Sequence, residues 1–118
     1  MKNKQPFQSA PKFERVPEEM GCGTSRVGFV EVDFASIVET FGPPSENDGY
    51  KTDAHWVIRF ADGTVATIYN YKRGRNYNGD GVPPVEEIRD WHVGGVCRRA
   101  FRLVAAALRL PDEHVVIE

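Results

Sequence analysis

The sequence predicts an α+β domain. In it, a small antiparallel sheet of three to four strands, arranged as a meander, packs against a C-terminal helix, with one short additional helix. Three observations predict this class. Two runs of β-branched and aromatic residues flank the turn signal Asp62-Gly63, which indicates a β-hairpin over residues 56–72. Apolar residues recur at helical spacing within residues 96–108 and, over a shorter stretch, within residues 34–41.

The chain has 118 residues, of which 41% are hydrophobic and 11% aromatic, enough for a core in one domain without disulfides or metals. We expect residues 1–26 to form an extended N-terminal arm, because this stretch is polar and has no periodicity. Residues 27–110 form the single α+β domain. Residues 111–118 form a C-terminal tail, either an edge strand or a flap. The spaced phenylalanines of the arm could dock on the domain, on a partner or on a neighbouring subunit, so a homodimer stays open.

The first elements of the domain have clear local signals. Residues 27–32 alternate roughly between apolar and other side chains, which predicts a short strand. Asp33 can accept hydrogen bonds from the free amides that open a helix over residues 34–41. Gly42 and the two prolines that follow it end this helix in the order typical of a helix C-terminus.

The register of the hairpin depends on the length of its turn. A loop of two or four residues pairs Phe60 with Val65 and Trp56 with Tyr69, and places Tyr69 and Tyr71 on the face of Trp56, which we expect to be the core face. A three-residue loop flips one strand relative to the other, because the side-chain period of a strand is two. The facing of both tyrosines is therefore left open.

Beyond the hairpin we expect a third strand at residues 86–93 and a structural corner at Gly94-Gly95, in preference to an anion site. The strongest helix of the chain follows, ends before Pro111, and has Cys97 among its core-facing positions. Its opposite side carries a narrow basic stripe of Arg98, Arg102 and Arg109.

The charge distribution argues against a wholly basic nucleic-acid binder. The formal net charge is -2, yet residues 62–110 hold eight Lys and Arg against five Asp and Glu, which suggests one positive face. Cys22 and Cys97 are expected to be reduced thiols of a cytosolic protein. The longest apolar run, residues 103–108, is too short to span a bilayer, and no signal peptide is present, so we expect a cytoplasmic protein without a membrane partner.

The sequence contains no motif that is specific for catalysis or for metal binding. The three histidines, His55, His92 and His114, fall on different predicted elements, and no His, Cys or Asp cluster repeats at ligand spacing. A core-facing Cys97 is a poor nucleophile, since thiolate chemistry needs an accessible, electropositive site. We therefore expect no enzyme activity, no catalytic residue, no metal and no cofactor.

The aromatic and basic segment that follows the hairpin is the best candidate binding region. Tyrosine rings can stack on bases while Arg and Lys neutralise phosphate, which suits a nucleotide or single-stranded nucleic acid. The same residue types anchor protein interfaces. A third interpretation is structural: the tyrosines only pack on the small sheet, and the basic residues only keep a loop solvated. The candidate binding residues are Tyr69, Tyr71, Lys72, Arg73, Arg75 and Tyr77, joined by Trp91 and His92 from the next strand.

Four runs of the sequence carry a resemblance: Phe41-Gly-Pro-Pro44, Tyr50-Lys-Thr-Asp53, residues 56–72 and Trp91-His-Val-Gly-Gly95. Over residues 30–108 the chain resembles a family of small bacteriophage-encoded proteins of unassigned function, so no functional residue can be carried over. The resemblance implies a protein working in the cytoplasm of an infected bacterium. In that context we expect a non-enzymatic protein that inhibits a bacterial antiviral defence component by binding it, as anti-CRISPR proteins do. The alternatives are sequestration of a signalling nucleotide or other anionic ligand by the Tyr/Arg/Lys loop, and a small housekeeping phage protein with no ligand.

Overall fold

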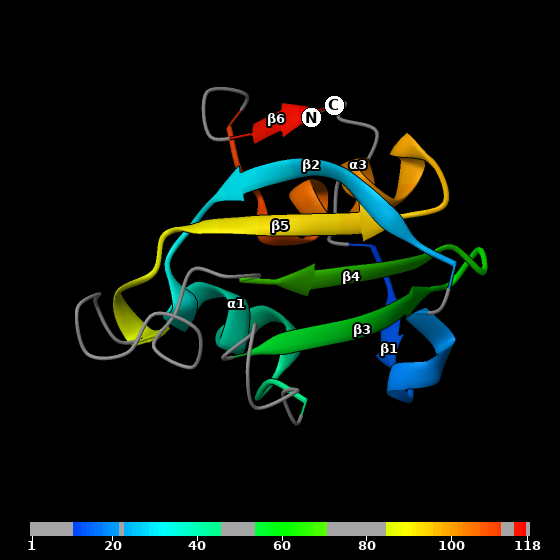
Figure 1. Ribbon diagram of the computed structural model, residues 1–118, viewed down its shortest axis with the longest axis horizontal. Helices are drawn as coiled ribbons and strands as arrows, with labels where there is room; N and C mark the ends of the chain where they lie inside the picture. The colour runs from blue at the N-terminus through cyan, green and yellow to red at the C-terminus, as the bar shows by residue number, and fades with distance from the viewer. Residues whose placement is uncertain (1–10, 22, 46–53, 71–84, 112–114, 118) are drawn as a thin grey trace, which may run out of the picture.

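A computed structural model describes residues 11–21, 23–45, 54–70, 85–111 and 115–117 of the chain. Within them six strands form one antiparallel sheet, and both α-helices pack against the same face of it (Figure 1). The strands are β1 (Phe13–Arg15), β2 (Ser25–Glu31), β3 (His55–Phe60), β4 (Val65–Tyr69), β5 (Asp90–Gly95) and β6 (Val115–Ile117). The helices are α1 (Phe34–Phe41) and α3 (Arg98–Leu108), and the short 3-10 helices are η1 (Glu18–Gly21) and η3 (Val85–Glu87).

The sheet has the strand order β1-β3-β4-β5-β2-β6, with the predicted meander β3-β4-β5 at its centre (Figure 1). The predicted α+β class, with a C-terminal helix packed on one sheet face, is confirmed. The sheet is wider than the predicted three to four strands because both chain ends contribute an edge. The expected arm supplies β1, which pairs with β3, and the tail supplies β6, which pairs with β2 as an edge strand.

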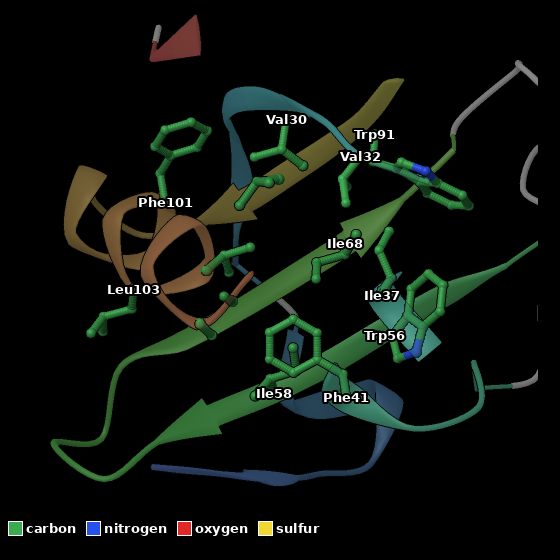
Figure 2. Close-up of a cluster of buried hydrophobic side chains, with 14 of the residues drawn as sticks. Val30, Val32, Ile37, Phe41, Trp56, Ile58, Ile68, Trp91, Phe101 and Leu103 are labelled. Atoms are coloured by element: carbon green, nitrogen blue, oxygen red, sulfur yellow. The ribbon is translucent and has the colours of Figure 1, made fainter. Parts of the chain in front are cut away.

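The hydrophobic core fills the layer between the sheet and the two helices. Figure 2 shows Trp56, Ile58 and Ile68 of the sheet in one buried cluster that also contains Ile37 of α1 and Phe101 of α3. All five side chains are at most 1% exposed. Burying each of them stabilises the fold by about 1.5–3 kcal/mol relative to exposure, which makes this layer the main source of stability.

The arm is anchored to this core through β1. The ring of Phe13 packs edge-on against Phe41, with centroids 4.8 Å apart, and against Phe60 at 6.3 Å. Arg15 donates from Nη1 to the carbonyl oxygens of Phe41 at 2.9 Å and Pro43 at 2.6 Å. A guanidinium at this place satisfies carbonyls that the end of α1 leaves without partners inside the helix.

Helix α1 has the predicted boundaries. Asp33 Oδ1 accepts from the amide of Ser36 at 3.0 Å, as an N-cap should, and Gly42 follows the last helical residue with φ 90°. The side chain of Trp56 ties this end of the helix to the sheet, because its Nε1 donates to the carbonyl of Gly42 at 2.8 Å. The local signals in the sequence were sufficient for this element.

The turn between β3 and β4 has three residues, Ala61 to Gly63. The amide of Gly63 donates to the carbonyl of Phe60 at 2.8 Å, and the amide of Phe60 donates to the carbonyl of Thr64, also at 2.8 Å. Gly63 adopts φ 92° in the left-handed region. This combination is a type I turn closed by a glycine bulge, the usual geometry of three-residue hairpins.

The pairing expected for a two- or four-residue loop is therefore wrong by one residue. Trp56 pairs with Ile68, and Tyr69 pairs with His55. The three-residue alternative holds because the glycine can take a positive φ without strain. As a result Tyr69 lies on the sheet face opposite to Trp56, while Tyr71 lies outside the described residues.

Two further predictions need correction around β5. The third strand runs from Asp90 to Gly95 and not over residues 86–93, so both glycines belong to the strand. Cys97 is the exposed N-cap of α3 and does not face the core. Close packing explains why a glycine ends this strand. A Cβ on Gly95 would lie 2.4 Å from the Cβ of Ala100, so α3 crosses β5 where only a glycine fits.

Candidate functional site

The sheet face opposite the helices, which we call the open face, carries a row of four cross-strand neighbours. His55 pairs with Tyr69, Tyr69 with His92, and His92 with Phe29. Their side chains share one face because strand side chains alternate in direction, and the intervening residues such as Ile68 enter the core. We call these four residues the aromatic row.

His92 is the packed centre of the row. Its ring lies 5.2 Å from that of Tyr69, at an interplanar angle of 84°, and 5.0 Å from that of Phe29, at 80°. Edge-to-face contacts of this kind fix ring orientation. His92 is only 5% exposed, whereas Phe29, Tyr69 and His55 are half-buried, so these three side chains supply the accessible surface of the row.

Charged residues border the row on both sides. On β2, Arg26 lies on one side, with its guanidinium carbon 4.7 Å from the centroid of the Phe29 ring, a cation–π distance. Glu31 pairs across β2 and β5 with Asp90 on the other side, and alternation places both on the open face. The row is thus an aromatic centre with a polar rim.

Two glycines lie close to side chains of the open face. A Cβ on Gly94 would lie 2.4 Å from Thr67 Oγ1, so Thr67 occupies space that a larger residue would fill, whereas the 3.5 Å to Tyr69 Cε1 would be an ordinary contact. Beside the row, η1 approaches the open face closely: a Cβ on Gly21 would lie 3.0 Å from Thr67 Cγ2 and 3.6 Å from Val57 Cγ1. The arm therefore covers the positions next to the row.

Asn70 fixes the end of β4 directly before the predicted binding segment. Its side chain is fully buried, and its Oδ1 accepts from the amide of Ala54 at 3.3 Å. Residue 54 precedes β3, so this hydrogen bond joins the start of one hairpin strand to the end of the other. The backbone next to Tyr69 is thereby held in place.

The structure brings together two of the predicted binding residues, Tyr69 and His92. Trp91 is not with them: it is completely buried on the core face, where its ring lies 5.5 Å from that of Trp56 and its Nε1 donates to the carbonyl of Ile88 at 3.3 Å. The remaining predicted residues lie outside the described part of the chain: Tyr71, Lys72, Arg73, Arg75 and Tyr77.

Phe29 and His55 were not predicted to belong to the same surface. His55 faces away from its neighbour Trp56 because strand side chains alternate, but the expected pairing of Trp56 with Tyr69 put His55 and Tyr69 on opposite faces. Phe29 lies on β2, which is far from β5 in the sequence, and no local pattern indicates that these two strands pair. The alternation of β2 alone could have marked Phe29 as facing away from Val30.

Among the described residues, no group of three or more His, Cys, Asp or Glu side chains could hold a metal ion. None of the helices in the described ranges combines the length and the apolar character needed to cross a membrane. No protein-family model matches the sequence, and no curated protein matches it. The resemblance to the bacteriophage family therefore stays a prediction.

Proposed function

We propose that this protein is a non-enzymatic binding protein that contacts a partner protein through the aromatic row. The observation that supports this best is the register that places Phe29, Tyr69 and His55 in one row with His92, on a face that neither α1 nor α3 covers. Aromatic residues and arginine are the preferred anchors of protein interfaces. Four adjacent strands about 4.8 Å apart make the row about 14 Å long, the scale of an anchor cluster at the centre of an interface.

The rim of the row favours a protein over an anionic small molecule. Interfaces combine an apolar or aromatic core with a polar, charged rim, and here Arg26 borders one side while Glu31 and Asp90 border the other. A rim that combines both charge signs suits a protein surface better than it suits a single phosphate group.

The resemblance to small bacteriophage proteins supplies the context of the proposal. We place the protein in the cytoplasm of an infected bacterium, with a bacterial defence component as its partner. Inhibition then follows from occlusion, because a surface that is buried under the bound protein cannot engage its own target. No catalytic group is needed for this mode of action.

The test is capture of the partner from phage-infected cells, identification by mass spectrometry and reconstitution with the purified partner. Tyr69→Ala should weaken the reconstituted complex about 30-fold, the size of a loss of about 2 kcal/mol at an interface anchor. Val96→Ala is the control, because Val96 is 80% exposed and lies beyond the end of β5, away from the row. Thermal melts of both variants show whether the fold is kept.

Three results would contradict the proposal. The wild-type chain could capture no defence component, or folded Tyr69→Ala could bind the purified partner as tightly as the control. A rise in melting temperature with a cyclic nucleotide, lost in Tyr69→Ala, would instead support sequestration of a nucleotide, since a ligand bound only to the native state stabilises it.

A further inference from the structure

Helix α1 carries an apolar hollow at its surface, which we call the α1 hollow. It has a volume of about 490 Å³. The described residues that line it are Phe34, Ala35, Ser36, Val38 and Glu39. The buried residues of the helix are different ones, Ile37 and Phe41, which belong to the core (Figure 2). The hollow therefore lies beside, and not on, the face of α1 that the core buries.

The apolar face of α1 is wider than the part of it that the core buries. At about 100° per residue, the buried Ile37 and Phe41 cover only about 40° of the helix circumference. Phe34, Val38 and Ala35 extend the apolar face to about 160°, although the first two are only half-buried and Ala35 is exposed. A helix that packs on a core needs an apolar stripe of about 100°. The additional width distinguishes α1 from a helix with an ordinary solvated face.

The aromatic part of the hollow is held rigidly. The ring of Phe34 stacks on that of Trp91, with centroids 6.2 Å apart and an interplanar angle of 29°, and lies 5.9 Å from that of Trp56. Both tryptophans are completely buried, and each donates from Nε1 to a backbone carbonyl. An anchor surface whose ring is already fixed loses little side-chain freedom when a partner binds.

Three exposed carboxylates lie on α1 and on the neighbouring 3-10 helix. Glu39 lines the hollow itself, and η3, which packs beside α1 (Figure 1), carries Glu86 and Glu87. No described residue forms an ion pair or a hydrogen bond with any of the three. Helix α1 itself contains no Lys or Arg.

Two arginines close to α1 act on other groups. Arg15 donates to the carbonyls of Phe41 and Pro43 at the end of the helix. Arg89 interacts electrostatically with the N-cap carboxylate of Asp33. The described surface of α1 and η3 therefore combines an apolar hollow with negative charge that no described side chain pairs.

We infer that the α1 hollow binds a basic amphipathic helix of a partner protein. Such a helix lays apolar side chains at i, i+3 and i+4 into an apolar hollow, and its Lys and Arg residues complement the charge of Glu39, Glu86 and Glu87. The eight residues of α1 span about 12 Å, which matches about two turns of a partner helix. Among the described residues only α1 lines the hollow, so they do not surround a small molecule as a ligand pocket does. The surface lies on the helix side of the sheet, opposite the aromatic row, so the inference goes beyond the proposed function.

The test is an anisotropy titration of the full-length protein against a fluorescein-labelled amphipathic peptide of about 18 residues, with Leu on one side and Lys and Arg on the other. Each of Glu39→Gln, Glu86→Gln and Glu87→Gln should weaken binding about 3-fold, and the triple variant about 30-fold, the effect of exposed ion pairs. Val38→Thr should weaken it about 5-fold, because the hydroxyl must lose its water in the complex. Glu14→Gln is the control: it also removes one exposed carboxylate, on the other sheet face, since its neighbour Phe13 packs on the core. Thermal melts show whether each variant keeps its fold.

Two control peptides separate recognition from simple attraction. One has Glu in place of each Lys and Arg, and the other has the same composition in an order without an apolar side; both should bind at least about 10-fold more weakly. The inference is overturned if the first peptide does not bind saturably up to about 200 μM protein, if either control peptide binds as tightly, or if the α1 and η3 variants bind like Glu14→Gln. It is also overturned if the wild type sediments as a dimer that Val38→Thr dissociates, because a second copy then covers the hollow. Tyr69→Ala should bind the peptide as the wild type does, so this inference and the proposed function can fail separately.

Discussion

Exchanging the residues that meet where α3 crosses β5 tests the packing of the two layers. A Cβ placed on Gly95 lies 2.4 Å from the Cβ of Ala100, whereas carbon atoms in contact sit about 3.5–4.0 Å apart. Gly95→Ala must therefore push the helix and the strand apart by about 1.1–1.6 Å. Overpacking of this kind costs about 1–3 kcal/mol, and replacing a strand glycine returns about 0.5–1 kcal/mol, so we expect a net loss of about 1–2 kcal/mol.

The compensating change is Ala100→Gly. Alone it should cost about 1.5–2 kcal/mol, from the lower helix propensity of glycine and the loss of one fully buried methyl group. In the double variant the collision is absent, because the methyl group has moved from the helix to the strand. Its loss should be only about 1 kcal/mol, well below the sum of the two single losses.

Urea unfolding followed by tryptophan fluorescence measures all three variants, since Trp56 and Trp91 are both completely buried and report on loss of the core. The coupling free energy of the cycle should be about 1–3 kcal/mol in favour of the double variant. Single losses that simply add, within about 0.5 kcal/mol, would refute the reasoning. The helix and the strand would then not be in direct contact at this crossing.

Three further predictions concern the turn and the cap. Hydrogen bonds from the backbone amide and the side chain of Thr64, followed by the hydrogen bond from Arg99, lower the pKa of Asp62 to about 2. The advantage of the wild type over Asp62→Asn in thermal melts should therefore be full above about pH 4 and disappear as the pH falls towards 2; a constant difference would contradict this. Asp33→Ala should cost about 0.5–2 kcal/mol in urea unfolding through loss of the cap on α1, whereas Asp33→Asn should cost much less. Gly63→Ala should cost about 1–2 kcal/mol, because φ 92° is strained for alanine, and an unchanged unfolding midpoint would argue against the glycine bulge.

The elements that were predicted correctly have signals within a few residues of each other. Helix α1 is bounded by Asp33 and Gly42, whose side chain and backbone act directly on the helix ends. The hairpin has a turn signal between two β-forming runs. Neither needs information from distant parts of the chain, which is why the class of the fold could be predicted as well.

The errors arise where a tertiary contact, and not the local pattern, decides the structure. The start of α3 could not be predicted because the role of Gly95 depends on Ala100, only five residues later, packing against it between the strand and helix layers. The strand β1 is three residues long and forms because β3 offers it an edge. Of the candidate site, the pair Tyr69 and His92 could be predicted from the meander, while Phe29 enters through the pairing of β2 with β5, for which the sequence has no local signal.

The length of the turn between β3 and β4 determines which side chains form the aromatic row. Because β4 side chains alternate, the length of the turn decides whether Tyr69 or Ile68 faces the helices. The three-residue turn sends Ile68 into the core and leaves Tyr69 next to His92 on the open face. With a two-residue turn the large apolar side chain would stand in solvent and the tyrosine in the core layer. Gly63, which touches neither ring, therefore determines the composition of the proposed binding surface, since its positive φ closes the turn at three residues.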